Sequence, residues 1–274
     1  MKRELDIAVG LAEKAGRVIL ERYRTEFRVS EKSGGRGPVT DADMAADEII
    51  CEGLSRAFPA DALTSEERED DPRRIDSERC WLVDPLDGTK HFVDRDGEFA
   101  VMMGLVVDGA PSLGVIHLPV EGLTIAGASS IGVSVRSNGI VQTSAISLAS
   151  WSEAGDSALR IASSRDSAGS RTRRAVANCG PHELVHSGSI GRKVALILLG
   201  RADAYLTLAG RSHRWDACAP EALMREAGGR FSDAFGEPLD YRAEDLRNHR
   251  GLLACRPGLE SRLVEGAVRL TSDR

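Results

Sequence analysis

The sequence predicts a mixed fold in which an α+β first half is followed by an α/β second half. Two amphipathic segments come first, and apolar runs then recur at a spacing of about ten residues. From residue 159 onward, short apolar runs alternate with helical periodicity, which favours a sheet flanked by helices. The Ser- and Thr-rich stretch 135–157 separates the two patterns. We therefore place a domain boundary near residue 140, with halves 1–140 and 141–274.

The first helix is predicted by apolar residues at 3-4-3-4 spacing, namely Leu5, Ala8, Ala12, Ala15 and Ile19. This period places them on one face of a helix over residues 3–24. Residues 30–38 then break the periodicity and predict a mobile loop. Two alternatives stay open for Lys32 and Arg36 in this loop. They are surface charges of a linker, or they close over an anion.

The second helix is predicted to begin after Thr40, because a Thr side chain caps the free N–H groups of a first helical turn. Asp41 and Asp43 follow in that turn, where acids interact favourably with the helix dipole. On local grounds these two acids are interpreted as capping residues rather than catalytic ones. The apolar face of this helix is formed by Ala46, Ile50, Leu54 and Ala57.

The stretch 81–90 carries the most chemical information. Its apolar start predicts a buried strand, which we expect to stop at Asp84 because Pro85 has no N–H for a sheet ladder. Asp84 and Asp87 then lie at the strand end, followed by a Gly-Thr pair. Oxygen ligands and free backbone N–H groups at one point suit a divalent cation and a phosphate together.

The remaining elements are predicted from apolar runs and helical periodicity. In the first half we expect a short strand at 63–65 and a meander of antiparallel strands at 99–107, 113–118 and 123–128. In the second half we expect, in order, strand 159–162, helix 167–178, strand 184–185, helix 190–199, strand 204–208, helix 216–226 and further strands beyond Gly229.

Composition excludes several classes of function. The net charge of −6 lacks the basic field that nucleic-acid polymers require, although bound cations would still permit a small anionic substrate. No apolar run approaches the roughly 18 residues of a membrane span, and no apolar signal region opens the chain. The five cysteines are scattered and never form a C-x-x-C pair, which favours reduced thiols in a cytoplasmic protein. A homodimer stays possible.

Several acids lie at the ends of predicted elements rather than along exposed helix faces. Glu66 ends one strand, Asp84 and Asp87 end another, and Asp216 opens a helix. Four carboxylates with a backbone carbonyl would hold two or three Mg²⁺ ions, the usual means of promoting attack of water on a phosphate ester. For Asp216, simple helix capping is an equally good interpretation.

Two segments of the second half carry weaker signals. Segment 187–193 opens a predicted helix, so its N–H groups and Lys193 could bind an anion; a simple turn is the alternative, and the spacing is not that of a P-loop. His182 and His186 match H-E-x-x-H, a zinc pattern that requires a helix. Pro181 leaves barely one turn here, and a strand would separate the histidines by about 13 Å. We expect a strand and no zinc site.

Four sequence blocks together resemble the inositol monophosphatase superfamily of Mg²⁺-dependent, lithium-sensitive phosphatases. Residues 84–89, Asp-Pro-Leu-Asp-Gly-Thr, resemble the D-P-[IL]-D-G-[TS] signature. Residues 215–229 resemble the second signature, W-D-x-[AC]-A with a downstream A-G-G. Residues 38–43 and 65–67 fill the other two blocks in the expected order. The resemblance covers nearly the whole chain and implies a layered α-β-α-β-α sandwich.

The resemblance also implies a role for each matching residue. Those that would ligate two or three Mg²⁺ ions are Glu66, Asp84, Asp87, Asp216 and the carbonyl group of Leu86. Those that would orient and deprotonate the attacking water are Asp43 and Thr89, with assistance from Glu66. Those that would contact the phosphate are Asp87, Gly88, Thr89 and Asp216. A Thr hydroxyl held by a carboxylate can take up or relay the proton of a metal-activated water.

Within the superfamily, two segments are more similar to the 3′(2′),5′-bisphosphate nucleotidases of bacterial sulfate assimilation. Residues 87–92 fit D-G-T-K-x-F and residues 95–99 fit R-x-G-E-F, whereas inositol monophosphatases more often carry D-G-T-x-N-F. In that branch the residues that align with nucleotide contacts are Ser164, Ser189 and Lys193. Ser167 departs from the pattern, because it stands where the animal enzymes have a histidine.

The resemblance therefore implies hydrolysis of 3′-phosphoadenosine 5′-phosphate to AMP and phosphate. One alternative is an inositol monophosphatase or another sugar-phosphate phosphatase with the same metal site. An alternative from a different class is a nucleotide- or metal-binding sensor without turnover. A phosphatase with an aspartyl nucleophile in D-x-D-G-T is disfavoured, because the two acids here are three positions apart.

Overall fold

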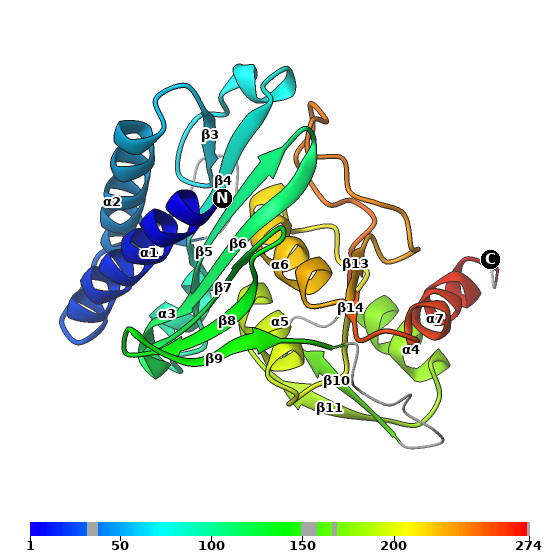
Figure 1. Ribbon diagram of the computed structural model, residues 1–274. Helices are drawn as coiled ribbons and strands as arrows, with labels where there is room; N and C mark the ends of the chain where they lie inside the picture. Colours follow the sequence, from blue (N-terminus) through cyan, green and yellow to red (C-terminus); the bar gives the residue numbers. More distant parts are fainter. Residues whose placement is uncertain (32–37, 149–157, 166–168, 273–274) are drawn as a thin grey trace.

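The computed structural model describes residues 1–31, 38–148, 158–165 and 169–272. Two helices cover one face of a seven-stranded sheet, and two more lie between that sheet and a five-stranded one (Figure 1). A last pair of helices covers the outer face of the five-stranded sheet (Figure 1). The predicted α-β-α-β-α sandwich is confirmed. The division into halves near residue 140 stays a prediction.

The first outer layer consists of α1 (Lys2–Tyr23) and α2 (Asp41–Ala57). The 3-4-3-4 apolar residues of α1 are all buried and pack with α2 against the seven-stranded sheet. Between the two helices, β1 (Val29–Glu31) and β2 (Pro38–Thr40) form an antiparallel pair. The predicted loop over 30–38 is therefore wrong at its two ends, which pair as strands. Lys32 and Arg36 lie outside the described residues.

The seven-stranded sheet has its strands side by side in chain order. Only β3 and β4 are parallel, and all later pairs are antiparallel. Its strands are β3 (Ala62–Ser65), β4 (Arg79–Asp87), β5 (Ala100–Val107), β6 (Ala110–Leu118), β7 (Leu123–Ala128), β8 (Gly132–Ser137) and β9 (Ile140–Ile146). The sequence did not predict β8 and β9, because only Val133 and Val135 of β8 are buried and polar residues alternate with them.

The second sheet has the strand order β11-β10-β12-β14-β13. Its strands are β10 (Leu159–Ser163), β11 (His182–His186), β12 (Ala204–Thr207), β13 (Arg230–Ser232) and β14 (Leu252–Cys255). The remaining α-helices are α3 (Thr89–Val93), α4 (Ser170–Asn178), α5 (Ile190–Leu198), α6 (Arg214–Glu226) and α7 (Glu260–Ser272), with short 3₁₀ turns at Pro72–Ile75 and Pro119–Glu121. The predicted alternation of strands and helices is confirmed, and α7 is an addition to it.

Helix α6 lies between the two sheets and is buried along most of its length. It approaches the seven-stranded sheet closely because two strand positions lack side chains. A Cβ at Gly104 would lie 2.4 Å from Sγ of Cys218, and a Cβ at Gly114 would lie 2.3 Å from the carbonyl oxygen of Ala219. This contact packs the first half of α6, which also carries Asp216, against β5 and β6.

Two further findings bear on the composition of the chain. None of the helices in the described parts is both long and apolar enough to cross a bilayer. Each of the five cysteines is a buried free thiol, as the scattered cysteine pattern predicted.

Candidate active site

The sequence predicted that strand β4 stops at Asp84, and this prediction is wrong, because the strand continues to Asp87. Asp84 pairs with Met102, and the next pair along the ladder is Asp87 with Ala100. Two residues of β4 therefore face one of β5, which is a β-bulge that needs no ladder N–H from Pro85. In a regular strand, side chains three positions apart point to opposite faces. The extra residue brings Asp84 and Asp87 to the same side.

A cluster of three buried carboxylates forms where β4 meets α6. The candidate ligand oxygens of Asp84, Asp87 and Asp216 all lie within 4.8 Å of one another. Asp216 also accepts a hydrogen bond from the backbone N–H of His213 and so caps α6. The capping interpretation of Asp216 is thus confirmed, and the same side chain also joins the cluster. Its role as a metal ligand stays a prediction.

The electrostatics of this cluster fit a divalent cation. Burial raises the pKa of Asp87 and raises that of Asp216 well above its usual value, and the charge of Glu66 raises both further. Such shifts mean that the charged carboxylates repel one another and lack solvent. A cation of hard character, which prefers carboxylate oxygens, would relieve both effects. The residues present therefore suit a bound metal ion.

Glu66 and Leu86 border the cluster from two neighbouring strands. Glu66 follows β3, is half-buried, and donates its backbone N–H to the carbonyl of Val83 at 3.1 Å. The Leu86 carbonyl oxygen lies 3.3 Å from the Thr89 hydroxyl oxygen. The structure thus places Glu66 close enough to act on the charges of the cluster, although its oxygens are not in the group that lies within 4.8 Å.

Asp43 and Thr89 form a buried pair beside the acids. Oδ2 of Asp43 accepts hydrogen bonds from the backbone N–H and the hydroxyl of Thr40, at 2.8 and 2.6 Å, and completes a capping box. Oδ1 of Asp43 accepts a 3.0 Å hydrogen bond from the Thr89 hydroxyl. Asp43 is completely buried, whereas Asp41 is exposed. The predicted capping role is therefore confirmed, and the second oxygen of Asp43 is directed to the site.

Helix α5 begins at the other side of the cluster. Oδ2 of Asp87 accepts a 2.6 Å hydrogen bond from the backbone N–H of Gly191, and Ser189 caps the helix by accepting from Arg192 N–H. Lys193 is buried and donates from Nζ to the carbonyls of Gly188 and Ser189. Burial lowers the pKa of Lys193 to about 8. Segment 187–193 is thus built into the site through Asp87.

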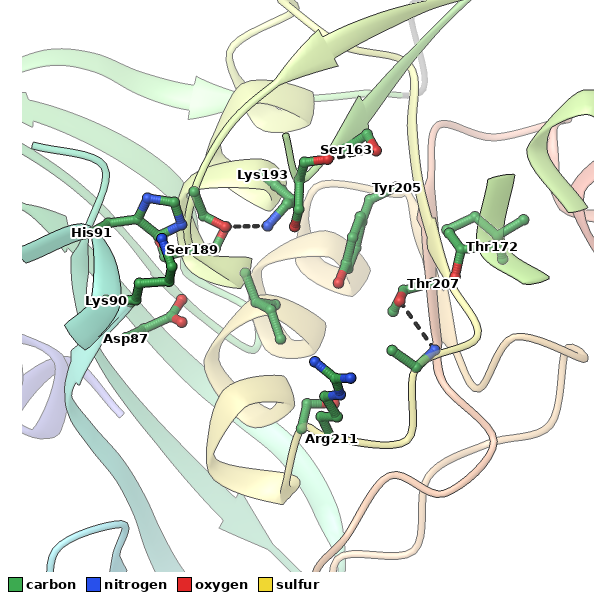
Figure 2. A pocket seen from close by; sticks show the side chains of 17 residues that line it. Asp87, Lys90, His91, Ser163, Thr172, Ser189, Lys193, Tyr205, Thr207 and Arg211 are labelled. Atoms are coloured by element: carbon green, nitrogen blue, oxygen red, sulfur yellow. Dashed lines mark hydrogen bonds between the residues drawn. The ribbon is translucent and has the colours of Figure 1, made fainter. Parts of the chain in front are cut away.

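A pocket extends from Asp87 and Gly88 toward the five-stranded sheet (Figure 2). Its walls contain each nucleotide contact that the sequence implied within the described residues, namely Ser164, Ser189 and Lys193. Ser167 lies outside the described residues. Sequence reasoning did not single out three other lining side chains, those of Tyr205, Thr207 and Arg211. No local pattern marks them, because the fold alone brings strand β12 and the loop after it to this pocket.

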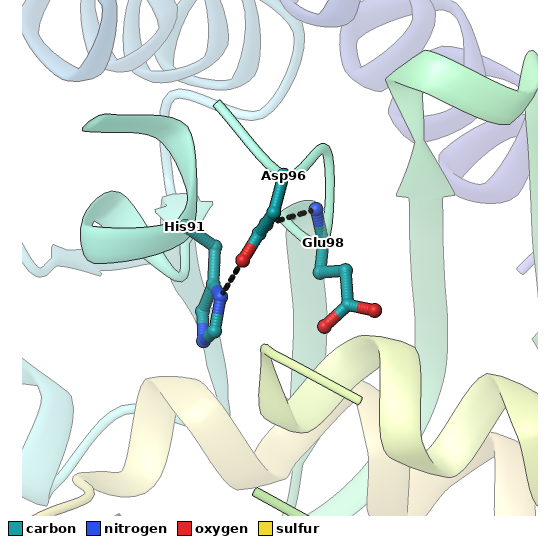
Figure 3. Close-up of side chains that lie close together, drawn as sticks. All are labelled: His91, Asp96 and Glu98. Carbon is teal, nitrogen blue, oxygen red and sulfur yellow. Dashed lines mark hydrogen bonds and ion pairs between the residues drawn. The ribbon is translucent and has the colours of Figure 1, made fainter. Parts of the chain in front are cut away.

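A second acidic group lies at the rim of the pocket. The candidate ligand atoms of His91, Asp96 and Glu98 lie within 4.8 Å of one another (Figure 3). However, Arg165 makes two hydrogen bonds to the carboxylate of Glu98, at 2.5 and 2.8 Å, and Asp96 is 2.7 Å from Nδ1 of His91. Both carboxylates therefore already have partners within the protein, so we interpret the group as a clamp that holds the loop after β10 against the start of β5.

Asp47 is a buried residue that the sequence analysis missed. One oxygen accepts a hydrogen bond from Ser65 and the other pairs with Arg68 at 2.7 Å. These contacts hold both sides of Glu66 in place. The available signal was a charged residue on the apolar face of α2, one turn after Asp43.

The H-E-x-x-H segment forms strand β11, and its two histidines are at opposite ends. The expectation of a strand is confirmed. This geometry does not bring the two imidazoles together on one helical face, as the zinc pattern requires.

Residues 1–269 match the inositol monophosphatase family. The chain belongs to this family and is a phosphoric monoester hydrolase. The buried acid site fits the metal dependence of such phosphatases.

Three relatives illustrate the range of similarity. The 3′(2′),5′-bisphosphate nucleotidase CysQ of Aggregatibacter actinomycetemcomitans is 34% identical over 239 residues, which is 86% of this chain and 87% of that protein. The crystal structure of CysQ from Bacteroides thetaiotaomicron superimposes with a TM-score of 0.78 and 30% identity, covering 93% of this chain and 97% of that one. A histidinol-phosphatase of Chlorobaculum parvum is 41% identical, but over only 44% of this chain and 46% of its own.

Proposed function

We propose that this protein hydrolyses 3′-phosphoadenosine 5′-phosphate to AMP and phosphate. The observation that carries the proposal is a single continuous site. The acid cluster and the Asp43–Thr89 pair lie at one end, and a pocket with serines, a buried lysine and an arginine extends from it. Relatives that align with most of the chain are named 3′(2′),5′-bisphosphate nucleotidases. Such a substrate needs both a site of hydrolysis and a second anionic contact.

The proposed cofactor is Mg²⁺, with two or three ions per site. Glu66, Asp84, Asp87, Asp216 and the Leu86 carbonyl would hold them, in keeping with the preference of Mg²⁺ for oxygen ligands. When bound, these ions would lower the pKa of a bound water and neutralise charge on the phosphate.

The protein's own groups would orient the nucleophile. The Thr89 hydroxyl donates its hydrogen to Oδ1 of Asp43, which leaves an oxygen lone pair on Thr89 free to accept a hydrogen from a water molecule. As that water attacks phosphorus, its proton would pass to Thr89 while the Thr89 proton moves to Asp43. The P–O bond to the ribose would break in the same step, and the leaving ribose oxygen would take up a proton from solvent water. The backbone N–H groups of Gly88 and Thr89 would hold the phosphate oxygens. Burial of Asp43 keeps competing water away from the relay.

The nucleotide would lie along the pocket. Nζ of Lys193 uses two of its hydrogens for the carbonyls of Gly188 and Ser189, so a third hydrogen is available to the substrate. The Ser189 hydroxyl accepts the N–H of Arg192 and donates its own hydrogen to Asp87, so it joins the start of α5 to the acid cluster. Ser164 lines the same wall. These donors suit ribose and phosphate oxygens.

The direct test is product analysis with purified protein. We expect AMP and inorganic phosphate in equal amounts in the presence of Mg²⁺, no release after chelation, and inhibition by Li⁺. Binding of the nucleotide with Mg²⁺ but without phosphate release would instead support the sensor alternative. Release of phosphate after the metal ions have been removed with a chelator, or a phosphoenzyme trapped on Asp84, would exclude the proposed chemistry.

One observation favours a second candidate, a phosphatase for a different small phosphate ester. The histidinol-phosphatase relative has the higher identity, although it aligns with less than half of the chain. A substrate panel that includes histidinol phosphate and inositol 1-phosphate separates the two candidates.

For location we propose the cytoplasm, since five free thiols suit a reducing compartment.

A further inference from the structure

Three cationic side chains line the pocket that leads away from the acid cluster, those of Lys90, Lys193 and Arg211. A bisphosphate nucleotide carries two phosphate groups, each with about −1.5 to −2 charges near pH 7. The acid cluster would take the phosphate that is cleaved. The second phosphate therefore needs a cation of its own farther along the pocket, and the question is which side chain supplies it.

Two of the three cations already have strong contacts within the protein. Lys90 forms an ion pair with Asp94 on the exposed side of α3. Lys193 is held beneath the helix start by the carbonyls of Gly188 and Ser189, and its Nζ lies 5.5 Å from the ring centroid of Tyr205. Their positions thus serve the part of the pocket that adjoins Asp87.

Arg211 differs from both. Its guanidinium has no hydrogen bond or ion pair with any residue that the structure describes. Figure 2 shows the side chain extending into the pocket from the loop after β12, across from Lys90 and His91 and below Tyr205. A guanidinium offers five N–H donors in a planar fork that matches phosphate oxygens. An arginine directed into a substrate pocket in this state is available to bind an anion.

One threonine hydroxyl on the same wall is also prepared as a donor. The Thr172 hydroxyl accepts the backbone N–H of Leu208 at 3.0 Å. A hydroxyl has one hydrogen, and accepting a bond leaves that hydrogen free to donate. Thr172 is almost completely buried and lines the pocket with Arg211. Thr207 lies on the same wall, but its side chain has a hydrogen bond with Tyr205.

We propose that Arg211 determines selectivity for bisphosphate nucleotides by binding the phosphate that is not cleaved, with Thr172 as a supporting donor. This inference rests on the proposed function and adds a residue to it. Arg211 does not touch the reacting phosphate, so its contribution is to substrate binding and not to the chemical step. A different role for Arg211, stacking on the adenine ring, would affect every adenine nucleotide equally.

The test compares two substrates that differ only in the second phosphate. Wild type, Arg211→Ala and Arg211→Lys are assayed with 3′-phosphoadenosine 5′-phosphate and with adenosine 3′-monophosphate. Where turnover of the monophosphate is slow, its inhibition constant against the bisphosphate replaces kcat/KM. Arg201→Ala is the matched control, because it removes the same charge from an exposed residue outside the pocket lining.

We expect Arg211→Ala to lower kcat/KM for the bisphosphate by about 10- to 100-fold, mainly through KM, because hydrogen bonds to charged groups have this order of effect. The monophosphate should change less than about twofold by the same reasoning. Arg211→Lys should be intermediate, and Arg201→Ala should match wild type. If kcat/KM or the inhibition constant for the monophosphate equals that of wild type, this also shows that the variant is folded.

Equal losses on both substrates, or no loss on either, would overturn the role of Arg211 while the proposed function stands. If wild type itself releases no phosphate from the bisphosphate, the proposed function fails, and the inference about Arg211 fails with it. The wild-type measurement therefore separates these two results.

Discussion

The Thr89 hydroxyl donates a 3.0 Å hydrogen bond to Oδ1 of Asp43, a residue 46 positions earlier in the chain. The other oxygen of Asp43 caps α2 through Thr40. The start of α2 and the start of α3 are thereby joined inside the site. Any loss of this bond leaves a buried carboxylate oxygen unpaired and an unoriented hydroxyl beside the acid cluster.

The first prediction concerns Thr89. Thr89→Ala removes the hydroxyl that would relay the proton, so kcat should fall by about 10²–10⁴-fold, the usual range for general acid–base catalysis. Thr89→Ser keeps the hydroxyl and should retain most of the activity. Steady-state kinetics with saturating Mg²⁺ measure both variants, and metal affinity should be largely unchanged. Wild-type turnover by Thr89→Ala would remove this residue from the mechanism.

The second prediction concerns the acid cluster. Asp87→Asn and Asp216→Asn should each abolish activity, because each removes a carboxylate from the proposed metal site. Without metal ions the same two variants should have a higher Tm than wild type. Burial and mutual repulsion raise the pKa of both residues and thus oppose their charged forms, and an amide carries no charge. The expected gain is about 2–4 °C for each kcal/mol. Lower thermal stability of both chelated variants would argue against a repulsive cluster.

The third prediction concerns the clamp of Glu98 and Arg165 at the pocket rim. Glu98→Gln weakens the two-bond ion pair but leaves the backbone carbonyl that accepts Ser189 N–H. We expect KM for the nucleotide to rise roughly three- to tenfold, about 1 kcal/mol, since Arg165 is half-exposed and its pair is screened by solvent. Arg165→Lys should show a similar rise with kcat nearly unchanged. A loss confined to kcat would contradict a positioning role.

The fourth prediction concerns stability at acid pH. Burial lowers the pKa of His117 to about 4, below its ordinary value of 6.5. The unfolded chain therefore binds a proton more readily, so the stability present above pH 6.5 is lost as the pH falls toward 4. The expected loss is about 3 kcal/mol. His117→Gln should flatten this pH dependence of the free energy of unfolding.

The control for that prediction is His186→Gln, which changes an exposed histidine at the end of β11. It should leave the slope between pH 6.5 and 4 close to that of wild type. Equal slopes for wild type and His117→Gln, measured by urea unfolding at several pH values, would show that His117 does not cause acid instability.

Much of the site was predictable because its residues stand at element ends in short sequence blocks. Local reasoning offered capping or catalysis as alternatives for Asp43 and Asp216, yet each carboxylate has two oxygens and caps a helix while it faces the site. Local sequence could not predict the bulge at Pro85, because the extra residue is defined only by its partner strand β5.

Other features depend on contacts between distant segments and have no local signal. Strands β8 and β9 lie in a polar stretch at one end of the seven-stranded sheet. Buried and half-buried residues alternate along β8, but this alternation indicates a strand only once the neighbouring strand is known. Arg211 stands in a polar loop, and only the packing of β12 beside β10 brings it to the pocket. For the same reason Asp47 resembled an ordinary helix residue, although it holds the segment around Glu66.

The central claim is that the site is built for a bisphosphate nucleotide. The most direct measurement is kcat/KM of the Mg²⁺-loaded enzyme for 3′-phosphoadenosine 5′-phosphate and for inositol 1-phosphate under the same conditions. We predict at least a roughly tenfold preference for the nucleotide, equivalent to about 1.4 kcal/mol of transition-state binding. A tenfold preference for inositol 1-phosphate would contradict the account.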